Sequence, residues 1–531
     1  MARSKQALAV LMAVALSSMP LFADEIHSHE QHAVLGEIGK APFPSTCSKA
    51  AQQEIDRGVA LIHSFWYAEA EKAFRKAAEA DPKCGTAWWG VAMSNYHPLW
   101  APPTPSELAV GKEAAEKAKT LGAKSARERD FIDAVNAYYG QSDTLDHRTR
   151  AVAYEKAMEK VAGTYPKDRE AAIFYALSLN GTAVPTDKTY ANQKKAAEIL
   201  NRILPQAPEH PGVAHYVIHS FDYPQLASLA LPAARTYAKV APGSPHALHM
   251  PSHIFTRLGL WDESISSNLA SAEKARNYVH AAKGADFTAF DELHAVDYLV
   301  YAYLQQHRYD EAKALLNKVN TVSKLDTPSF AAAYSLGAVP ARYALERRQW
   351  KEAAALRPVQ FDWEKVPYAE SNVHFARAIG AARVGDLEAA RDGLGRLALI
   401  QQTLVEQKNT YWAEQLQIQR TAAEAWLRLA EKKPEKALEL MRAAADLESS
   451  TEKHPVTPGA VVPARELLAD MLLELGKPEE SLKELEMSSS VAPNRYNGLW
   501  LASQAAQKAG KADEAKEYES RMARLTAGRK M

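Results

Sequence analysis

One sequence unit recurs along most of the chain and limits the folds that the chain can adopt. Its clearest copy is GVALIHSFWYAEAEKAFRKAAEADP, where small and aromatic residues recur at helical spacing before Pro82. The same cadence returns in GLWDESISSNLASAEKA, HRYDEAKALLNKV, RRQWKEAAAL, VGDLEAARDGLGRLA, KKPEKALELMRAAADLE, LGKPEESLKELEMSSSVAP and AGKADEAKEYESRMARL. Between these copies the sequence keeps helical periodicity, with short Gly/Pro turns and little strand-like alternation. The repeat therefore predicts an all-α protein.

These units resemble tetratricopeptide repeats, which are pairs of antiparallel helices about 34 residues long. In the clearest unit the resemblance rests on Gly58, Tyr67, Ala70, Phe74 and Pro82. More narrowly, HSFWYAEAEKAF, AWWGVAMSNYHPLW, AHYVIHSFDYP and PHALHMPSHIFTRLGLWDESI resemble a family of exported bacterial tetratricopeptide-repeat proteins, described only by their repeats. The resemblance supports the fold and supplies no reaction.

The resemblance implies a right-handed α-solenoid of about eleven or twelve helix pairs over residues 47–531. A solenoid buries its core between neighbouring repeats, so its parts need not be independent folding domains. Residues 24–46 come before the first repeat, and we expect them to form an N-terminal arm that is poorly ordered or wraps the solenoid.

Residues 1–23 have the composition of a secretory signal peptide. Arg3 and Lys5 precede an apolar run, and the small residue Ala23 stands ahead of Asp24 at the expected cleavage point. No later stretch approaches the roughly 20 apolar residues that a membrane span requires. We therefore expect an exported protein, periplasmic or secreted, without a membrane span.

Export changes how the two cysteines are interpreted. Thiols outside the cytosol tend to be oxidised, so we expect a disulfide between Cys47 and Cys84. The sequence lacks the CxxCH of covalently attached haem and the CxxC of a redox pair.

Overall charge gives no sign of a nucleic-acid partner, because 64 basic residues balance 64 acidic ones and alternate with them along the helices. A phosphate-binding glycine loop, a GxSxG elbow and an HExxH motif are also missing from the sequence. We therefore expect neither nucleic-acid binding nor a nucleotide cofactor, and the sequence leaves the catalytic residues, if any, unknown.

Two histidine-rich segments, HPGVAHYVIHS and SPHALHMPSHIF, share one spacing. His215 and His219 lie one helical turn apart in the first segment, and His249 and His253 are spaced identically in the second. On a helical projection these side chains, with His246, fall opposite the apolar packing face. The offset between the two segments is the length of one repeat, so the two pairs should occupy equivalent points on neighbouring helices.

A third helix joins this register through a repeat that is longer than the others. The alignment sets His246 against His294, His249 against Asp297 and His253 against Tyr301. The first helix of each pair lines the concave groove in tetratricopeptide-repeat proteins, so the resemblance implies that these side chains lie in the groove.

The residue types predict a metal centre. Two histidines at i and i+4 share a helical face, and imidazole suits copper, zinc, iron and nickel. The ligand candidates are His215, His219, His249 and His253, followed by His246, His294 and Asp297, with Asp222 as a further candidate. Asp297 is expected either to bind the ion or to orient His294. The metal, copper, zinc or iron, and the number of ions stay open, as does a reaction with water or dioxygen.

Two alternatives compete with the metal centre. The histidines can form a polar pocket for an organic or anionic ligand, or structural hydrogen bonds alone. The runner-up function is an interaction scaffold without catalysis, whose concave groove binds a peptide, a protein or a small molecule.

Three further groups of residues are weaker candidates, each with a structural alternative. His63 and His97, among aromatic residues, form either a ligand wall or inter-repeat packing; His27, His29 and His32 form either a weak metal tract or a solvated arm. A C-terminal group forms either a groove-end pocket or a buried ion pair with rigid turns: Arg465, Glu466, Asn494 and Arg495.

Overall fold

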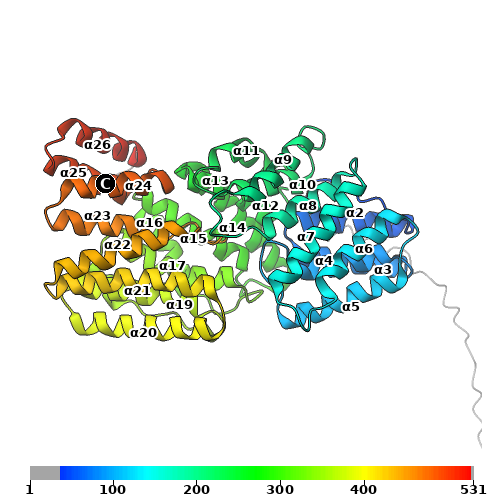
Figure 1. The fold of residues 1–531 in the computed structure, drawn as a ribbon, viewed down its shortest axis with the longest axis horizontal. Helices are drawn as coiled ribbons and strands as arrows, with labels where there is room; N and C mark the ends of the chain where they lie inside the picture. The colour runs from blue at the N-terminus through cyan, green and yellow to red at the C-terminus, as the bar shows by residue number, and fades with distance from the viewer. Residues whose placement is uncertain (1–35, 528–531) are drawn as a thin grey trace, which may run out of the picture. The chain divides into compact units, whose positions relative to one another are not determined.

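The computed structural model describes residues 36–527, and their regular secondary structure is helical apart from one isolated bridge between Thr288 and Leu325 (Figure 1). The first helices are α2 (Lys49–His63), α3 (Tyr67–Ala80), α4 (Gly85–Tyr96), α5 (Pro105–Leu121), α6 (Ala126–Tyr139), α7 (His147–Thr164), α8 (Arg169–Gly181), α9 (Ala191–Ile203), α10 (Pro211–Phe221), η1 (Ala227–Ala230), α11 (Leu231–Val240), α12 (Pro245–His249), α13 (Pro251–Arg257) and α14 (Trp261–Lys283). The remaining helices are α15 (Phe290–Gln305), α16 (Tyr309–Asn320), α17 (Phe330–Glu346), α18 (Trp350–Ala355), η2 (Trp363–Lys365), α19 (Pro367–Val384), α20 (Leu387–Glu406), α21 (Thr410–Ala430), α22 (Pro434–Ser450), α23 (Ala464–Glu474), α24 (Pro478–Val491), α25 (Tyr496–Lys508) and α26 (Ala512–Thr526). The expected signal peptide and the histidines of the expected arm lie outside the described residues.

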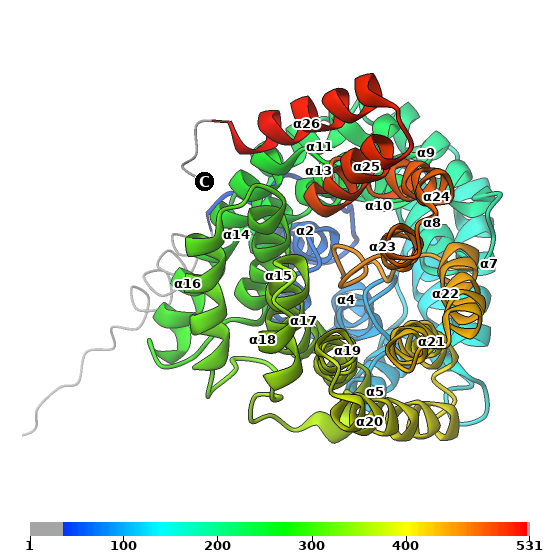
Figure 2. The same cartoon turned by 90° about the vertical axis from the view of Figure 1, so that its left-hand side faces the viewer.

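The helices pack as stacked pairs. Each helix contacts the next along the chain, and alternate helices also contact each other, as α2 does α4 and α15 does α17. In Figure 2, α20 lies along the lower edge of the view and α19 lies nearer its centre. This pattern of contacts confirms the all-α solenoid of helix pairs that the repeats predicted.

The first repeat shows why the small and large residues of the unit recur. Phe74 of α3 is fully buried, with Gly58 of α2 on one side and Gly90 of α4 on the other. A Cβ atom added at Gly90 would lie 2.1 Å from the Phe74 ring, and one at Gly58 would lie 2.7 Å from it. The two glycines therefore make room for the ring at the junction of two repeats.

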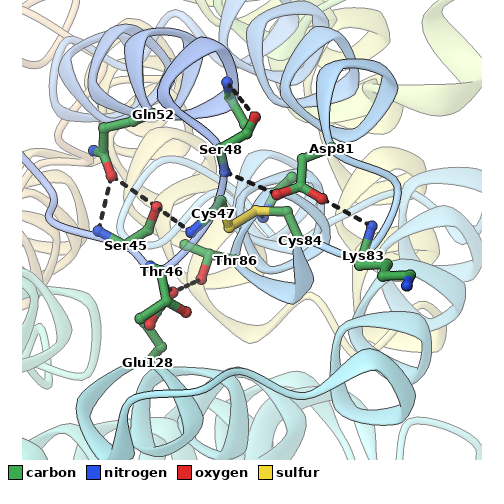
Figure 3. Close-up of a disulfide and its surroundings, with 12 residues drawn as sticks. Ser45, Thr46, Cys47, Ser48, Gln52, Asp81, Lys83, Cys84, Thr86 and Glu128 are labelled. Atoms are coloured by element: carbon green, nitrogen blue, oxygen red, sulfur yellow. Dashed lines mark hydrogen bonds between the residues drawn. A yellow bond between two sulfur atoms is a disulfide. The ribbon is translucent and has the colours of Figure 1, made fainter.

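A disulfide joins Cys47 and Cys84, as the sequence predicted (Figure 3). It ties the residue before the N-cap of α2 to the N-cap of α4, and the backbone N–H of Ser48 donates to the Asp81 carboxylate at 2.8 Å nearby. The bond closes a loop around the first helix pair, which limits the conformations of the unfolded chain.

The described part of the N-terminal arm packs against the solenoid. Phe43 is fully buried and stacks on Trp89 at 4.7 Å between ring centroids. The backbone N–H of Lys40 donates to the carbonyl of Glu209 at 3.0 Å. The arm thus bridges the first repeat and the turn before α10.

Two departures from the regular repeat shape the region around the histidines. Pro251 begins α13 directly after α12, so the first helix of that repeat is divided in two. The second departure is the long connection between α22 and α23, residues 451–463, which we call the strap. Figure 2 shows it running from α23 toward the centre of the view.

Gly90→Ala should destabilise the protein, because its methyl group would overlap Phe74 and the adjoining repeats must separate to admit it. We expect a loss of about 1–3 kcal/mol in the free energy of unfolding, measured by urea denaturation. Gly163→Ala, on helix α7, is the matched control, since nothing lies within 4 Å of its added Cβ. Equal midpoints for the two variants would contradict this account of the repeat junction.

Candidate metal centre

Six histidines from four helices meet in the interior of the solenoid. They are His215 and His219 of α10, His246 and His249 of α12, His253 of α13 and His294 of α15. All are buried, with at most 8% of any residue exposed. The sequence placed them in a concave groove; the structure shows a closed interior, because the aromatic residues and the strap described below cover them.

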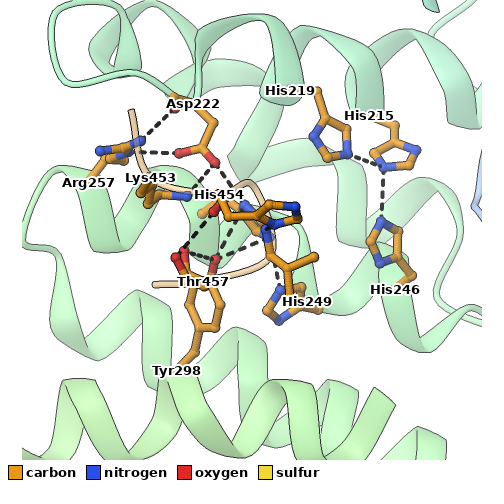
Figure 4. A network of polar contacts seen from close by, with 12 residues as sticks. His215, His219, Asp222, His246, His249, Arg257, Tyr298, Lys453, His454 and Thr457 are labelled. Carbon is orange, nitrogen blue, oxygen red and sulfur yellow. Dashed lines mark hydrogen bonds and ion pairs between the residues drawn. The ribbon is translucent and has the colours of Figure 1, made fainter. Parts of the chain in front are cut away.

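The first group, which we call triad 1, consists of His215, His219 and His246. The Nε2 atom of His215 lies 3.1 Å from Nε2 of His219 and 3.1 Å from Nε2 of His246 (Figure 4). One nitrogen from each ring lies within 4.8 Å of one from every other ring, so a single ion can contact all three.

The second group, triad 2, consists of His249, His253 and His294. The Nε2 atoms of His249 and His253 lie 3.0 Å apart. His294 completes the group within the same 4.8 Å limit, and its own Nε2 atom is buried without a hydrogen-bond partner among the described residues.

Hydrogen bonds on the far side of three rings determine where their protons lie. His215 Nδ1 is 2.7 Å from the backbone carbonyl of His63, and His249 Nδ1 is 2.6 Å from Oδ1 of Asn268. The Asn268 amide is oriented by its own donation to the Ser264 carbonyl at 2.8 Å. Since these oxygens only accept, each Nδ1 carries the proton and each Nε2 presents a lone pair.

His253 is held in the same way by a carboxylate. Its Nδ1 atom donates to Oδ2 of Asp222 at 3.0 Å. The lone pairs of His249 and His253 therefore face each other at 3.0 Å, an arrangement that repels unless a cation lies between them. Outer hydrogen bonds of this kind orient metal-binding histidines in general.

Asp222 is the charged anchor of triad 2. It also accepts from Arg257 at 2.9 Å and from Lys453 of the strap at 2.8 Å (Figure 4). Burial by itself raises the pKa of Asp222, but the positive charges of Lys453 and Arg257 outweigh it and hold that pKa well below its usual value. Burial lowers the pKa of Lys453 to about 8.

Burial also keeps the histidines neutral. It lowers the pKa of His215 to about 3 and, together with neighbouring imidazoles, lowers the pKa of His219, His246, His249 and His294 well below 6.5. For His253, burial lowers the pKa although Asp222 opposes the shift. Neutral imidazole is the form that binds a metal ion.

Aromatic side chains cover both triads. Phe65 lies 4.4–5.4 Å from the three rings of triad 1, between ring centroids. Tyr298 lies 4.7–5.7 Å from the rings of triad 2, and Trp100 contacts His246 at 5.2 Å and His294 at 6.2 Å. Phe65 adopts φ of +54°, a left-handed conformation that is uncommon for an aromatic residue.

The strap packs against the residues around triad 2. The Tyr298 hydroxyl donates to the carbonyl of Thr457 at 3.1 Å, and Arg342 donates to the carbonyl of Ala460 at 2.8 Å. Lys188 binds Glu452 at 2.7 Å. The strap is therefore fastened at both ends and in the middle.

The structure places Asp297 outside both triads. Its carboxylate faces Arg342 at 3.6 Å, and burial raises its pKa to about 6 against the opposing charge of that arginine. Tyr301, which the repeat alignment set against His253, accepts a hydrogen bond from Arg495 at 2.7 Å. On α15 it is Tyr298, one turn after His294, that shares the face of the histidine.

A third group, His63, Glu170 and His210, also lies within 4.8 Å, and Glu170 bridges its two histidines, while Nδ1 of His210 is buried without a hydrogen-bond partner among the described residues. Glu170 lies 2.9 Å from His63 Nε2 and 2.6 Å from His210 Nε2, and His63 Nδ1 lies 2.9 Å from the Tyr216 hydroxyl. Burial favours a raised pKa for Glu170, yet the two histidines lower it below its usual value. These hydrogen bonds leave no lone pair of His63 free.

The remaining candidates lie elsewhere. His97 contacts the ring of Tyr67 at 4.7 Å and lies 3.9 Å from Glu107. Arg495 forms a buried ion-pair network with Glu346 and Glu466, each at 2.6 Å, while Asn494 accepts from Arg521 at 3.2 Å. Arg465 binds Glu484 at 2.6 Å. The histidines of the expected arm, His27, His29 and His32, lie outside the described residues.

Sequence reasoning did not find Asn268, Tyr298 or Lys453. The i, i+4 spacing from His294 was a usable signal for Tyr298. Asn268 lies on a second helix, and Lys453 lies on the strap, in a different part of the sequence from Asp222. Neither position carries a sequence signal for this site.

A family model and several solved structures are similar to this chain. A tetratricopeptide-repeat family model matches residues 55–84. Among solved structures, the chain is similar to the human IFIT1 dimer with PPP-AAAA, at 14% identity and a TM-score of 0.38 over 90% of this chain and 91% of that one. It is also similar to the APC/C hetero-tetramer Cut9–Hcn1, at 13% identity and a TM-score of 0.37 over 91% and 81% of the two chains. Nothing matches among the curated proteins.

The stacked helix pairs show an all-α solenoid fold, and the family match identifies one tetratricopeptide repeat within it, at residues 55–84. Within residues 36–527, none of the helices has the length and apolar character needed to cross a membrane.

The metal-free protein should lose stability as the pH falls from 7.5 to 5.5. Histidines whose pKa is lowered by folding take up protons below about pH 6.5 only in the unfolded chain, so acid favours unfolding. Because the pKa of histidine in the unfolded chain lies near 6.5, each such histidine contributes about 1.4 kcal/mol in total over this pH range. Urea denaturation of the chelated protein at several pH values measures this change in the free energy of unfolding.

His147→Gln serves as a graded check on this change. Burial lowers the pKa of His147 to about 4, so this variant should lose the contribution of about one proton. An unfolding free energy that is constant between pH 7.5 and 5.5 would refute the burial of neutral histidines.

Proposed function

We propose that this protein binds transition metal ions, copper, zinc or iron, in the buried histidine centre formed by triads 1 and 2. The observation that carries the proposal is the pair of lone pairs on His249 and His253. Both rings donate through Nδ1, so their Nε2 atoms meet at 3.0 Å without a proton to share, and the unpartnered Nε2 of His294 lies beside them. A metal ion is the cation that satisfies all three nitrogens.

The alternatives from the sequence account less well for these contacts. Structural hydrogen bonding explains the His63, Glu170 and His210 group, where every bond has a donor and an acceptor. In triad 2 it leaves two acceptors facing each other. An anionic ligand would meet the same lone pairs and be repelled.

A peptide in the concave groove is also less well supported near the histidines. The strap occupies this region, through Lys453 on Asp222 and Thr457 on Tyr298. We therefore assign partner binding, if the solenoid has it, to surfaces away from the centre.

We further propose that the protein works outside the cytoplasm. The basic, apolar and small residues at its start have the order of a signal peptide. The disulfide between Cys47 and Cys84 supports this location, since such bonds persist in oxidising compartments.

Protein purified without a histidine tag should contain copper, zinc or iron in stoichiometric amounts, or take one of them up after chelation. A His215→Ala/His249→Ala double variant should lose at least tenfold in metal content by elemental analysis. The His147→Ala/His280→Ala double variant, which removes two histidines outside the triads, should keep the wild-type content.

Metal loading should also raise the midpoint of thermal unfolding, because only the folded chain presents the triads. At a free metal concentration of 100 times Kd the gain is about 2.7 kcal/mol. Wild-type protein that takes up no first-row transition metal at all would rule out the proposed function.

A further inference from the structure

The two triads are built on one plan. Each consists of two histidines spaced i, i+4 in one repeat and a third histidine from the first helix of the following repeat. Triad 1 takes His215 and His219 from α10 and His246 from α12. Triad 2 takes its pair, His249 and His253, from α12 and α13, and its third ring from α15.

The repeat relates the two triads residue by residue. His215 corresponds to His249, and His219 corresponds to His253 at the same spacing of one repeat. His246 corresponds to His294 in the lengthened repeat. The same three roles are therefore present twice, in adjacent repeats, as expected of two equivalent ion sites.

The triads lie as close to each other as the most widely separated rings within either triad. Ring centroids of His219 and His253, from different triads, are 6.0 Å apart, and those of His246 and His249 are 6.2 Å apart. Within the triads, the separation of His219 from His246 is 6.4 Å. Trp100 contacts a ring of each triad. Two bound ions would therefore share one enclosed space.

The donor set restricts the metal. All six donors are neutral imidazoles, and the nearest acidic groups are engaged elsewhere. Asp222 is occupied by His253, Arg257 and Lys453, and Asp297 faces Arg342. Soft-to-borderline ions bind imidazole well, and copper has the highest affinity among the divalent first-row ions.

The charges around the centre also limit which metal ions it can hold. Around Asp222, the buried positive groups Arg257 and Lys453 face that carboxylate and also interact with the charge of Glu452, which is itself paired with Lys188. A pair of doubly charged ions added to this interior carries a large electrostatic cost without an accompanying anion. Singly charged Cu(I) on three neutral imidazoles lowers that cost, and two Cu(II) ions lower it by sharing a bridging hydroxide.

We propose that triads 1 and 2 hold a pair of copper ions, one per triad, close enough for both ions to contact one bridging oxygen ligand. This inference rests on the proposed metal-binding function and deepens it. It assigns the metal, the number of ions and the class of centre, a pair of copper ions that share one oxygen ligand.

The test uses the chelated full-length protein, loaded with Cu(I) under anaerobic conditions and freed of excess metal. Ferricyanide then oxidises it, each ferricyanide taking one electron from one copper ion. Elemental analysis gives copper per chain, and electron paramagnetic resonance gives unpaired spins per copper. We expect two coppers per chain with less than half of the spins visible, because a shared bridge pairs the spins of two Cu(II) ions.

Single variants isolate each triad. His246→Gln and His294→Gln should each bind one copper whose spin is fully visible, and His280→Gln, on α14, should match the wild type. Circular dichroism monitors folding, and the wild-type spin count decides the question even if one variant fails to fold.

The outcomes separate the two proposals. Two coppers per chain with every spin visible, or one copper per chain, would overturn the copper pair and leave metal binding in place. Binding of zinc or iron with no uptake of copper would do the same. No uptake of any of these metals would overturn both.

Discussion

The hydrogen bonds on the outer side of the histidine rings are the interactions on which the rest of the centre depends. In each, the Nδ1–H group donates a hydrogen bond to an oxygen. The proton therefore stays on Nδ1, and Nε2 carries a lone pair that faces the inside of the centre. The backbone carbonyl of His63, the amide of Asn268 and the carboxylate of Asp222 perform this role for His215, His249 and His253. Without these acceptors, the same rings could exchange hydrogen bonds among themselves and need no ion.

This arrangement is costly in a metal-free protein. A buried polar atom without a partner costs about 1–3 kcal/mol, and His294 Nε2 and the facing lone pairs of triad 2 are such atoms. The surrounding solenoid must offset the cost. The fastened strap and the aromatic covers Phe65 and Tyr298 supply packing on the sides that the helices leave open.

The charged groups of the centre are placed asymmetrically. Asp222, Arg257 and Lys453 all lie beside triad 2, whereas the known anchor of triad 1 is the neutral backbone carbonyl of His63. The two triads therefore share a plan but differ in electrostatic surroundings, and their ions should differ in affinity.

Much of the fold could be predicted from the sequence, because a repeat specifies its own packing. Phe74 between Gly58 and Gly90 is an example in which residue sizes alone indicate the junction. The spacing of one repeat likewise identified histidines in equivalent roles.

Which residues touch each other was harder to predict than which residues occupy equivalent positions in neighbouring repeats. The register set His246 against His294 and His249 against Asp297; in the structure His246 meets His215, and His249 meets His294 at 4.2 Å between ring centroids. Equivalent residues are displaced along neighbouring helices, so each touches a residue about one turn away from its counterpart. The strap could not be placed at all, since its contacts with Asp222 and Tyr298 join parts of the chain far apart in sequence.

The most direct test of the central claim, that the inward lone pairs hold metal, is a crystal structure of the copper-loaded protein with anomalous diffraction collected at the copper edge. The account predicts one strong anomalous peak beside Nε2 of His215, His219 and His246, and a second beside Nε2 of His249, His253 and His294. A peak at His63, Glu170 and His210 alone, or anomalous density at neither triad, would contradict it.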